Sequence, residues 1–223
     1  MGRILSNYGG MLLTALGQTL IMALGSLVFA CLIGLLFGIL SVVKNKVCNL
    51  ISRIFVDIIR GVPMIVLAFF VFFGVPTVIN RMLPAGGFTL TALQAGIICL
   101  SLNCGAYMAE IIRAGIQSVD VGQMEACRSL GMSYTQAMRK VILPQAIKTM
   151  IPSIINQFII TLKDTSILSV IGFPELVNTS KNVVAITMKA FEVWALVGIM
   201  YLIVITILSY LAKLVERRMN RGR

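Results

Sequence analysis

Five long apolar stretches dominate this 223-residue sequence, and they leave few ways for the chain to fold. Hydrophobic residues make up 58% of the chain and charged residues 12%, whereas soluble domains have about 45–50% and about 25%. About 20 helical residues cross the hydrocarbon core of a bilayer. We therefore expect an all-α membrane protein with a single transmembrane domain over residues 1–223. Its spans are predicted at about 17–43, 60–79, 89–109, 146–163 and 193–213.

The first apolar stretch is too long for one crossing of the bilayer. Its beginning, Ile4–Thr14, is therefore expected to lie along the membrane interface as an elbow ahead of the first span. This segment lacks the cationic flank and the small-residue cleavage site of a secretory signal peptide. We expect it to remain part of the folded domain.

Basic residues are unevenly shared among the loops, and their distribution predicts the orientation. Most of the lysines and arginines fall in the loops after the first and third spans and in the C-terminal tail. By the positive-inside rule these parts are cytoplasmic, which places the N-terminus outside and the C-terminus inside. The residues concerned are Lys44, Lys46, Arg53, Arg60, Arg113, Arg128, Arg139, Lys140, Lys148, Lys213, Arg217, Arg218, Arg221 and Arg223.

Several classes of function lack their characteristic residues in this chain. The sequence has no histidine, no G-x-x-x-x-G-K-[ST] phosphate-binding loop and no C-x-x-C among its five cysteines. The thirteen methionines are scattered and are best explained as core residues. The net charge of +11 follows from membrane orientation better than from nucleic-acid binding. We expect no catalytic site, no metal site and no bound cofactor in this chain.

The polar segment between the third and fourth spans, residues 114–145, carries the clearest local signals. Gly131 follows a helix-compatible run and can take the left-handed conformation that ends a helix. Ser133 and Gln136 then fit a capping box that starts a second helix, and Pro144 suits the first turn of a new helix. The segment is either a docking device for a soluble partner or a capped loop that packs beneath its own bundle.

This segment resembles the signature loop of the membrane subunits of bacterial ABC importers. The signature reads Glu-Ala-Ala, three residues, Gly, nine residues and Ile-x-Leu-Pro, and its spacing is intact here. Cys127 stands in place of the third alanine and Val141 in place of the isoleucine, and both changes keep size or apolarity. The residues that the resemblance assigns to coupling are Glu125, Ala126, Cys127, Gly131, Leu143 and Pro144.

Three other stretches are similar to the polar amino acid branch of that family. Residues 107–119 and 162–172 match two of its motifs closely. Residues 60–63 read Arg-Gly-Val-Pro, where the branch commonly has Arg-Gly-Thr-Pro, and Leu67 stands where it often has glutamine. The resemblance covers most of the chain.

The resemblance implies an importer permease of type I fold in a bacterial inner membrane. Two such subunits, identical or related, would form the pathway, and an extracytoplasmic binding protein would deliver a polar amino acid. A dimer of cytoplasmic ATPases, which itself binds ATP and Mg, would grip the segment 114–145. Closure of the ATPases would move these segments and switch access from outside to inside.

Polar side chains near the spans are candidates for the solute pathway. Lys163 and Asp164 could meet the carboxylate and the amine of a zwitterion, or they could pair with each other and fix the end of the fourth span. Gln157 and Thr161 are four residues apart and share one helix face. The pathway candidates are Asn103, Tyr107, Asn156, Gln157, Thr161, Lys163 and Asp164.

Two further patterns concern packing between and along helices. Glu110 and Arg113 lie three residues apart and are expected to pair on one helix face, with gating as the alternative role. Ala30, Gly34 and Gly38 form a ridge of small residues that lets another helix approach closely. The sequence does not indicate which helix that is.

A small channel or an ion-coupled carrier that works without ATPases is the principal alternative. Such a carrier needs acidic side chains buried in the middle of its spans. The eight acidic residues here lie near span ends or in loops, which favours the importer. A membrane-embedded enzyme is the third possibility, and it would need a nucleophile or metal cluster that the sequence lacks.

Overall fold

The computed structural model describes residues 2–83 and 87–220, and every regular element in these ranges is a helix. Arg221 and Arg223 of the basic tail lie outside the described residues. The elements are α1 (Gly2–Val42), α2 (Lys46–Gly61), α3 (Met64–Phe69), η1 (Phe70–Gly74), α4 (Val75–Met82), α5 (Ala92–Gln117), α6 (Val121–Ser129), α7 (Tyr134–Ala137), η2 (Met138–Ile142), α8 (Leu143–Asp164), η3 (Thr165–Ile171), α9 (Leu176–Thr187) and α10 (Ala190–Asn220).

Five helical stretches of the described chain are long and apolar enough to cross a membrane, as predicted. Their outward faces carry large apolar side chains such as Leu24, Leu32 and Ile203, which are more than half exposed. So much exposed apolar surface is unfavourable in water for a small protein, whereas it is favourable against lipid. The candidate spans are Gly2–Val42, Met64–Met82, Ala92–Gln117, Tyr134–Ile171 and Ala190–Leu214.

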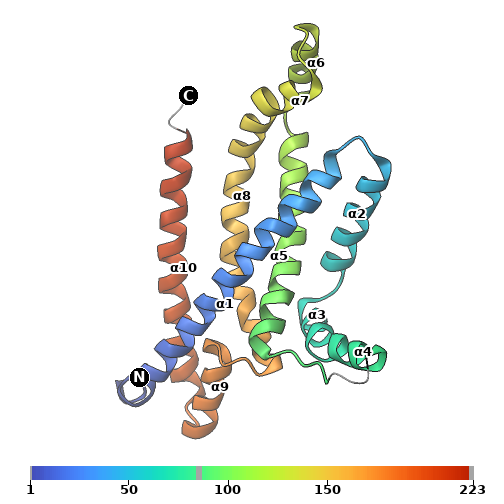
Figure 1. Cartoon of the computed structure of the whole chain (residues 1–223). Coiled ribbons are helices and arrows are strands. Elements are labelled where there is room, and N and C mark those ends of the chain that lie inside the picture. Colours follow the sequence, from blue (N-terminus) through green and yellow to red (C-terminus); the bar gives the residue numbers. More distant parts are fainter. Residues whose placement is uncertain (1, 84–86, 221–223) are drawn as a thin grey trace.

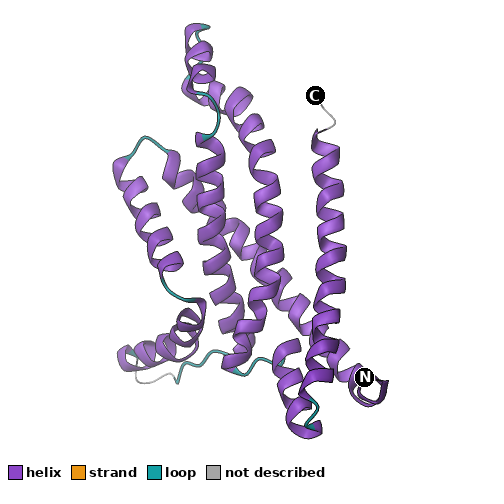
Figure 2. Ribbon diagram, turned by 180° about the vertical axis from the view of Figure 1, so that it is seen from behind, coloured by secondary structure: helices purple, strands orange, loops and turns teal. Residues whose placement is uncertain are grey.

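The predicted elbow is part of one continuous helix, α1, of 41 residues. At 1.5 Å per residue this helix is about 60 Å long, roughly twice the thickness of the hydrocarbon core. Its first turns point in a different direction from the remainder in Figures 1 and 2. Ile4 and Leu12 are buried there against residues of α9 and α10, including Val183 and Val193. Packing onto these helices holds the beginning of α1 in place.

Helix α2 occupies residues that the sequence analysis treated as a cytoplasmic loop. Asn45 caps it, because its Oδ1 accepts a hydrogen bond from the Val47 backbone N–H at 2.8 Å. Its outer face carries exposed apolar side chains, while its polar side chains line cavities between α2 and the bundle. This arrangement is the reverse of a water-exposed amphipathic helix and suits a lipid environment. The outer residues are Val47, Leu50, Ile51, Ile54 and Ile58.

The chain changes direction after α2, where Val62 and Pro63 are both extended. The following helices, α3, η1 and α4, fold back across one end of the bundle (Figure 1). Buried apolar residues of α3 and η1, including Leu67 and Val71, join a core cluster with Met22, Leu100 and Leu168. The interruption of the helix at Val62 and Pro63 therefore lies next to a packed core.

The two ends of the bundle differ. Helices α6 and α7 project at one end, and α10 finishes at that same end (Figure 1). Helix α9, the beginning of α1 and helix α4 lie at the opposite end (Figures 1 and 2). The segment with the signature spacing, residues 114–145, therefore lies at one end of the helical bundle.

Candidate functional site

The turn at Gly131 joins the two short helices of the projecting segment. Gly131 has a φ of 79°, the left-handed conformation expected of it. Its N–H donates to the Arg128 carbonyl at 3.0 Å, and the Met132 N–H donates to the Cys127 carbonyl at 3.1 Å. Arg128 also donates from Nη1 to the Met132 carbonyl at 2.8 Å. These bonds satisfy carbonyl groups at the end of α6 and fix the angle between the helices.

The second half of the segment begins with the predicted capping box. The Gln136 N–H donates to Ser133 Oγ at 3.2 Å, and the Ser133 N–H donates to Gln136 Oε1 at 2.9 Å. Pro144 lies in the first turn of α8, but this turn continues the preceding π-helical turn η2, so Pro144 does not start a separate helix as expected. Helix α7, the π-helical turn η2, helix α8 and η3 then form one helical stretch, Tyr134–Ile171.

One face of the segment is buried where its short helices α6, α7 and η2 contact one another, and another face is open. Cys127, Ala137 and Ile142 are buried. Glu125 and Ala126 are exposed, and Leu130 is 82% exposed at the tip. The segment is thus a capped helical projection that packs on itself and keeps exposed residues at its tip (Figure 1).

Four of the seven pathway candidates line one cavity of about 510 Å³ at the break between α2 and α3. Asn103 and Tyr107 reach it from α5, and Gln157 and Asp164 reach it from α8. We call this space the central cavity. Its remaining lining residues are Arg60, Gly61, Val62, Pro63, Met64 and Ile160.

The other three candidates lie outside that lining. Asn156 and Lys163 are exposed elsewhere on α8. Thr161 is buried and donates a hydrogen bond to the Gln157 backbone carbonyl at 2.9 Å, so it supports the helix from within. Among the described residues Lys163 and Asp164 form no ion pair with each other, so the structure gives no support to the pairing alternative.

Residues 60–64 contribute to the central cavity although sequence reasoning did not nominate them. A Gly-Val-Pro sequence breaks the helix and leaves backbone and side chains free to line a space. Met64 reaches across to α5, where its sulfur accepts a hydrogen bond from Asn103 Nδ2 at 3.6 Å. The sequence signal that could have predicted this part of the lining is the helix-breaking Gly-Val-Pro directly after Arg60.

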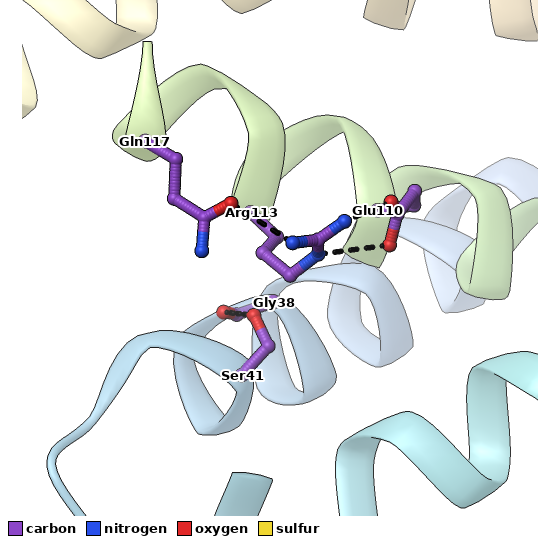
Figure 3. Close-up of polar contacts among 5 residues, drawn as sticks. All are labelled: Gly38, Ser41, Glu110, Arg113 and Gln117. Atoms are coloured by element: carbon purple, nitrogen blue, oxygen red, sulfur yellow. Dashed lines mark hydrogen bonds and ion pairs between the residues drawn. The ribbon is translucent and has the colours of Figure 1, made fainter. Parts of the chain in front are cut away.

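Glu110 and Arg113 form the predicted ion pair on α5 (Figure 3). Arg113 Nε donates to Glu110 Oε2 at 3.0 Å, and Arg113 Nη1 donates to Gln117 Oε1 at 2.8 Å. The pair lies beside Ser41 at the end of α1, whose Oγ donates to the Gly38 carbonyl at 2.6 Å. Arg113, on the same helix, thereby neutralises the charge of Glu110.

Among the residues that the structure describes, no three or more His, Cys, Asp or Glu side chains are grouped so that they could bind a metal ion. The five cysteines are free, and Cys99, Cys104 and Cys127 are buried. The polar groups of the central cavity are amides, a phenol, a carboxylate and a guanidinium. Such a set can bind a polar solute by hydrogen bonds and charge.

Comparison with known proteins identifies relatives over most of the chain. The sequence profile described as "Binding-protein-dependent transport system inner membrane component" matches residues 30–221. The glutamine transport system permease protein of Escherichia coli (strain K12) is 36% identical over 174 residues, which is 78% of this chain and 77% of that protein. A probable amino-acid permease protein of Bacillus subtilis (strain 168) is 41% identical over 182 residues, 81% of this chain and 79% of that protein.

Solved structures show the same arrangement of helices. The crystal structure of an amino acid ABC transporter with histidines contains a chain with a TM-score of 0.86 and 36% identity, covering 96% of both chains. An inward-facing structure of a methionine ABC transporter gives a TM-score of 0.75 at 21% identity, covering 94% of this chain and 96% of that one. The second likeness concerns the fold alone.

Proposed function

This chain belongs to the family of binding-protein-dependent transport inner membrane components, and we propose that it is the permease subunit of an ATP-driven importer of a polar amino acid. One observation supports this most: the helical stretch Tyr134–Ile171 begins in the projecting segment and carries Gln157 and Asp164 into the central cavity. A displacement of the segment would be transmitted along this helix to the cavity.

The projecting segment would bind a cytoplasmic ATPase. Glu125, Ala126 and Gly131 offer the exposed surface, while Cys127 is buried, Leu143 is half-buried and Pro144 lies in the first turn of α8. ATP and Mg would be held by the ATPase dimer, and hydrolysis would take place there. With the ATPase at the projecting end, that end and the C-terminus would be cytoplasmic and the N-terminus would lie on the outer side of a bacterial inner membrane, in agreement with the distribution of basic residues.

The central cavity would bind the solute in transit. Asp164 offers a carboxylate to an ammonium group, and Asn103, Tyr107 and Gln157 offer hydrogen-bond donors and acceptors. A second permease subunit, identical or related, would complete the pathway, and an extracytoplasmic binding protein would deliver the solute. Glu110 and Arg113 would keep the end of α5 intact beside the pathway.

The test begins with purification of the intact assembly from native membranes and identification of the ATPase and binding protein that accompany this chain. The assembly is then reconstituted in liposomes with Mg-ATP on the ATPase side and a panel of radiolabelled amino acids on the other. We expect concentrative uptake of at least one polar amino acid that requires ATP and the binding protein. Uptake by this chain alone, without nucleotide, would instead establish a channel or an ion-coupled carrier.

A further inference from the structure

A second polar cavity of about 470 Å³ lies between α2, the end of α1 and α5, and we call it the vestibule. Ser41, Asn49 and Gln117 line both the vestibule and a further space beneath the projecting segment. The vestibule is thus on the side of the central cavity that leads toward the segment. Its other lining residues are Ser52, Arg53, Val56, Asp57, Arg60, Ala109, Glu110 and Arg113.

The vestibule contains charges that the fold leaves unpaired. Glu110 and Arg113 neutralise each other, but Arg53, Asp57 and Arg60 form no ion pair with any described residue. All three lie on the inner face of α2, whose outer face is apolar. Charged side chains on a helix of this kind are costly unless they serve a pathway or a ligand. Two guanidinium groups and one carboxylate suit a zwitterion, and the excess positive charge favours its carboxylate.

Arg60 lies between the vestibule and the central cavity. It lines both spaces, and its guanidinium carbon is 4.8 Å from the centre of the Tyr107 ring. Tyr107 comes from α5 and lines the central cavity. A cation–π contact of this kind holds by attraction between the guanidinium and the ring, and it breaks when a carboxylate competes for the guanidinium. The contact can therefore separate the two spaces without sealing them permanently.

We propose that the vestibule is a second solute site, which takes the carboxylate of the amino acid after it leaves the central cavity, and that the Arg60–Tyr107 contact separates the two sites. This inference rests on the proposed transport of an amino acid. The solute would move from the groups of the central cavity to Arg60 and then to Arg53. Asp57, one turn from both, would remain available to its ammonium group.

The proposed role of the Arg60–Tyr107 contact is tested by measuring how fast the amino acid leaks from vesicles in the absence of ATP. The intact assembly is reconstituted in phosphatidylcholine vesicles, so that no anionic headgroup competes for the arginines. The vesicles are loaded with the radiolabelled amino acid that the uptake panel identifies. In the absence of nucleotide, Arg60→Gln and Tyr107→Leu should release solute about tenfold faster than the unaltered assembly, because each removes the Arg–Tyr contact. Tyr107→Phe keeps the aromatic ring and should leak more slowly than Tyr107→Leu.

Arg81→Gln is the matched control, since Arg81 is exposed on α4 and lines neither space. Its leak should equal that of the unaltered assembly. Size-exclusion chromatography of each variant verifies that the assembly is whole. If Arg60→Gln leaks no faster than Arg81→Gln, the Arg60–Tyr107 contact does not separate the central cavity from the vestibule.

The second site is tested by protection from labelling. Ser41→Cys places a thiol in the vestibule with little change in size, and a membrane-impermeant cationic thiosulfonate labels it from the side of the projecting segment. The same amino acid should slow this labelling, read per peptide by mass spectrometry, while native Cys48, which lines neither space, is unaffected. A vestibule thiol that the amino acid does not protect overturns the second site, whatever the leak result.

Failure of this inference and of the proposed function are distinguishable. An assembly that takes up no amino acid with ATP fails the proposed function before these variants are made. An assembly that takes up its amino acid normally, but shows neither faster leak in Arg60→Gln nor protection of Ser41→Cys, fails this inference alone. Slower labelling in vesicles with added phosphatidylglycerol, but not with the amino acid, would assign the vestibule to lipid phosphate and overturn the proposal.

Discussion

Gly34 on α1 lies so close to Met108 on α5 that a Cβ atom added to Gly34 would stand 2.5 Å from the Cβ atom of Met108. One turn later, a Cβ atom added to Gly38 would stand 2.8 Å from Cγ2 and 2.9 Å from Cβ of Ile112. Real Cβ contacts are essentially never this short, so the two helices approach as closely as they do only because side chains are missing here. The predicted ridge of small residues is confirmed, and its partner is α5.

Replacing Gly34 with alanine should therefore destabilise the protein. The added methyl group has no space, and overpacking of a tight contact costs about 1–3 kcal/mol. Thermal unfolding in detergent should show a lower midpoint for Gly34→Ala. Gly17→Ala, on the same helix with nothing within 4 Å of the new Cβ, should match or exceed the unaltered protein. Equal midpoints for both variants would show that α1 can shift without cost.

Gly131→Asp should abolish uptake while the protein still folds. Gly131 has open space around it, and aspartate tolerates the left-handed conformation better than most residues, so the turn can survive. The new carboxylate projects from the face that we propose for the ATPase and adds negative charge at the end of α6, where it is unfavourable. Expression should persist, but the ATPase should no longer co-purify.

Gly87→Asp is the control for that variant, because Gly87 also has a positive φ, 52°, with open space around it, outside the projecting segment. This variant should retain the ATPase on purification. Retention of the ATPase and normal uptake by Gly131→Asp would refute the docking role.

Asp164 and Lys163 are neighbours in sequence but should differ in their importance for transport. Asp164 lines the central cavity, whereas Lys163 is exposed outside it. A hydrogen bond to a charged group contributes about 1.5–3 kcal/mol, so Asp164→Asn should reduce the initial uptake rate at low solute by about ten- to a hundredfold. Lys163→Gln should leave uptake near normal. The reverse order would place the solute on the other face of α8.

These residues also show what the sequence could and could not predict. The capping box at Ser133, the turn at Gly131 and the Glu110–Arg113 pair depend on spacing within one segment, and all three are present. Asp164 and Lys163 are separated by about 100° around the helix, so only tertiary packing decides which one meets the cavity.

Helix α2 was missed for a related reason. Its polar side chains, such as Asn49 and Arg53, resemble those of a solvated loop, because sequence periodicity does not say which face is turned outward. The vestibule exists only because that polar face is turned inward. Because the vestibule is lined by side chains from three helices, the sequence of no single helix predicts it.

Met188→Gly should stabilise the protein. Met188 ends α9 with a φ of 56°, a left-handed conformation that is unfavourable for a residue with a Cβ, and its side chain is 86% exposed. Glycine relieves the strain and loses no packing, for a gain of about 0.5–1 kcal/mol. Thermal unfolding should show a higher midpoint, whereas Ile186→Gly, inside α9, should lower it. A drop for Met188→Gly would mean that the side chain has a partner on the membrane surface.

Glu175 should make the stability of the end of the bundle that carries α9 depend on pH. The carboxylate is fully buried, accepts hydrogen bonds from the N–H groups of Val177 at 2.8 Å and Asn178 at 2.6 Å, and lies 3.4 Å from the Tyr201 hydroxyl. Burial raises the pKa of Glu175 above its ordinary value of 4.5, against the lowering effect of these hydrogen bonds and of Lys181. The folded protein therefore holds a proton at pH values where the unfolded chain has released it.

The sign of the pH effect follows from that difference in bound protons. The stabilisation from this carboxyl group is complete below its ordinary pKa and is lost as pH rises through the raised value in the folded state. Glu175→Gln cannot titrate at this position and provides the reference. Lowering the pH from about 7 toward about 5 should therefore raise the unfolding midpoint of the unaltered protein relative to Glu175→Gln. A relative fall over that range would mean that the hydrogen bonds to Val177 and Asn178 outweigh burial, and that the pKa of Glu175 is lowered.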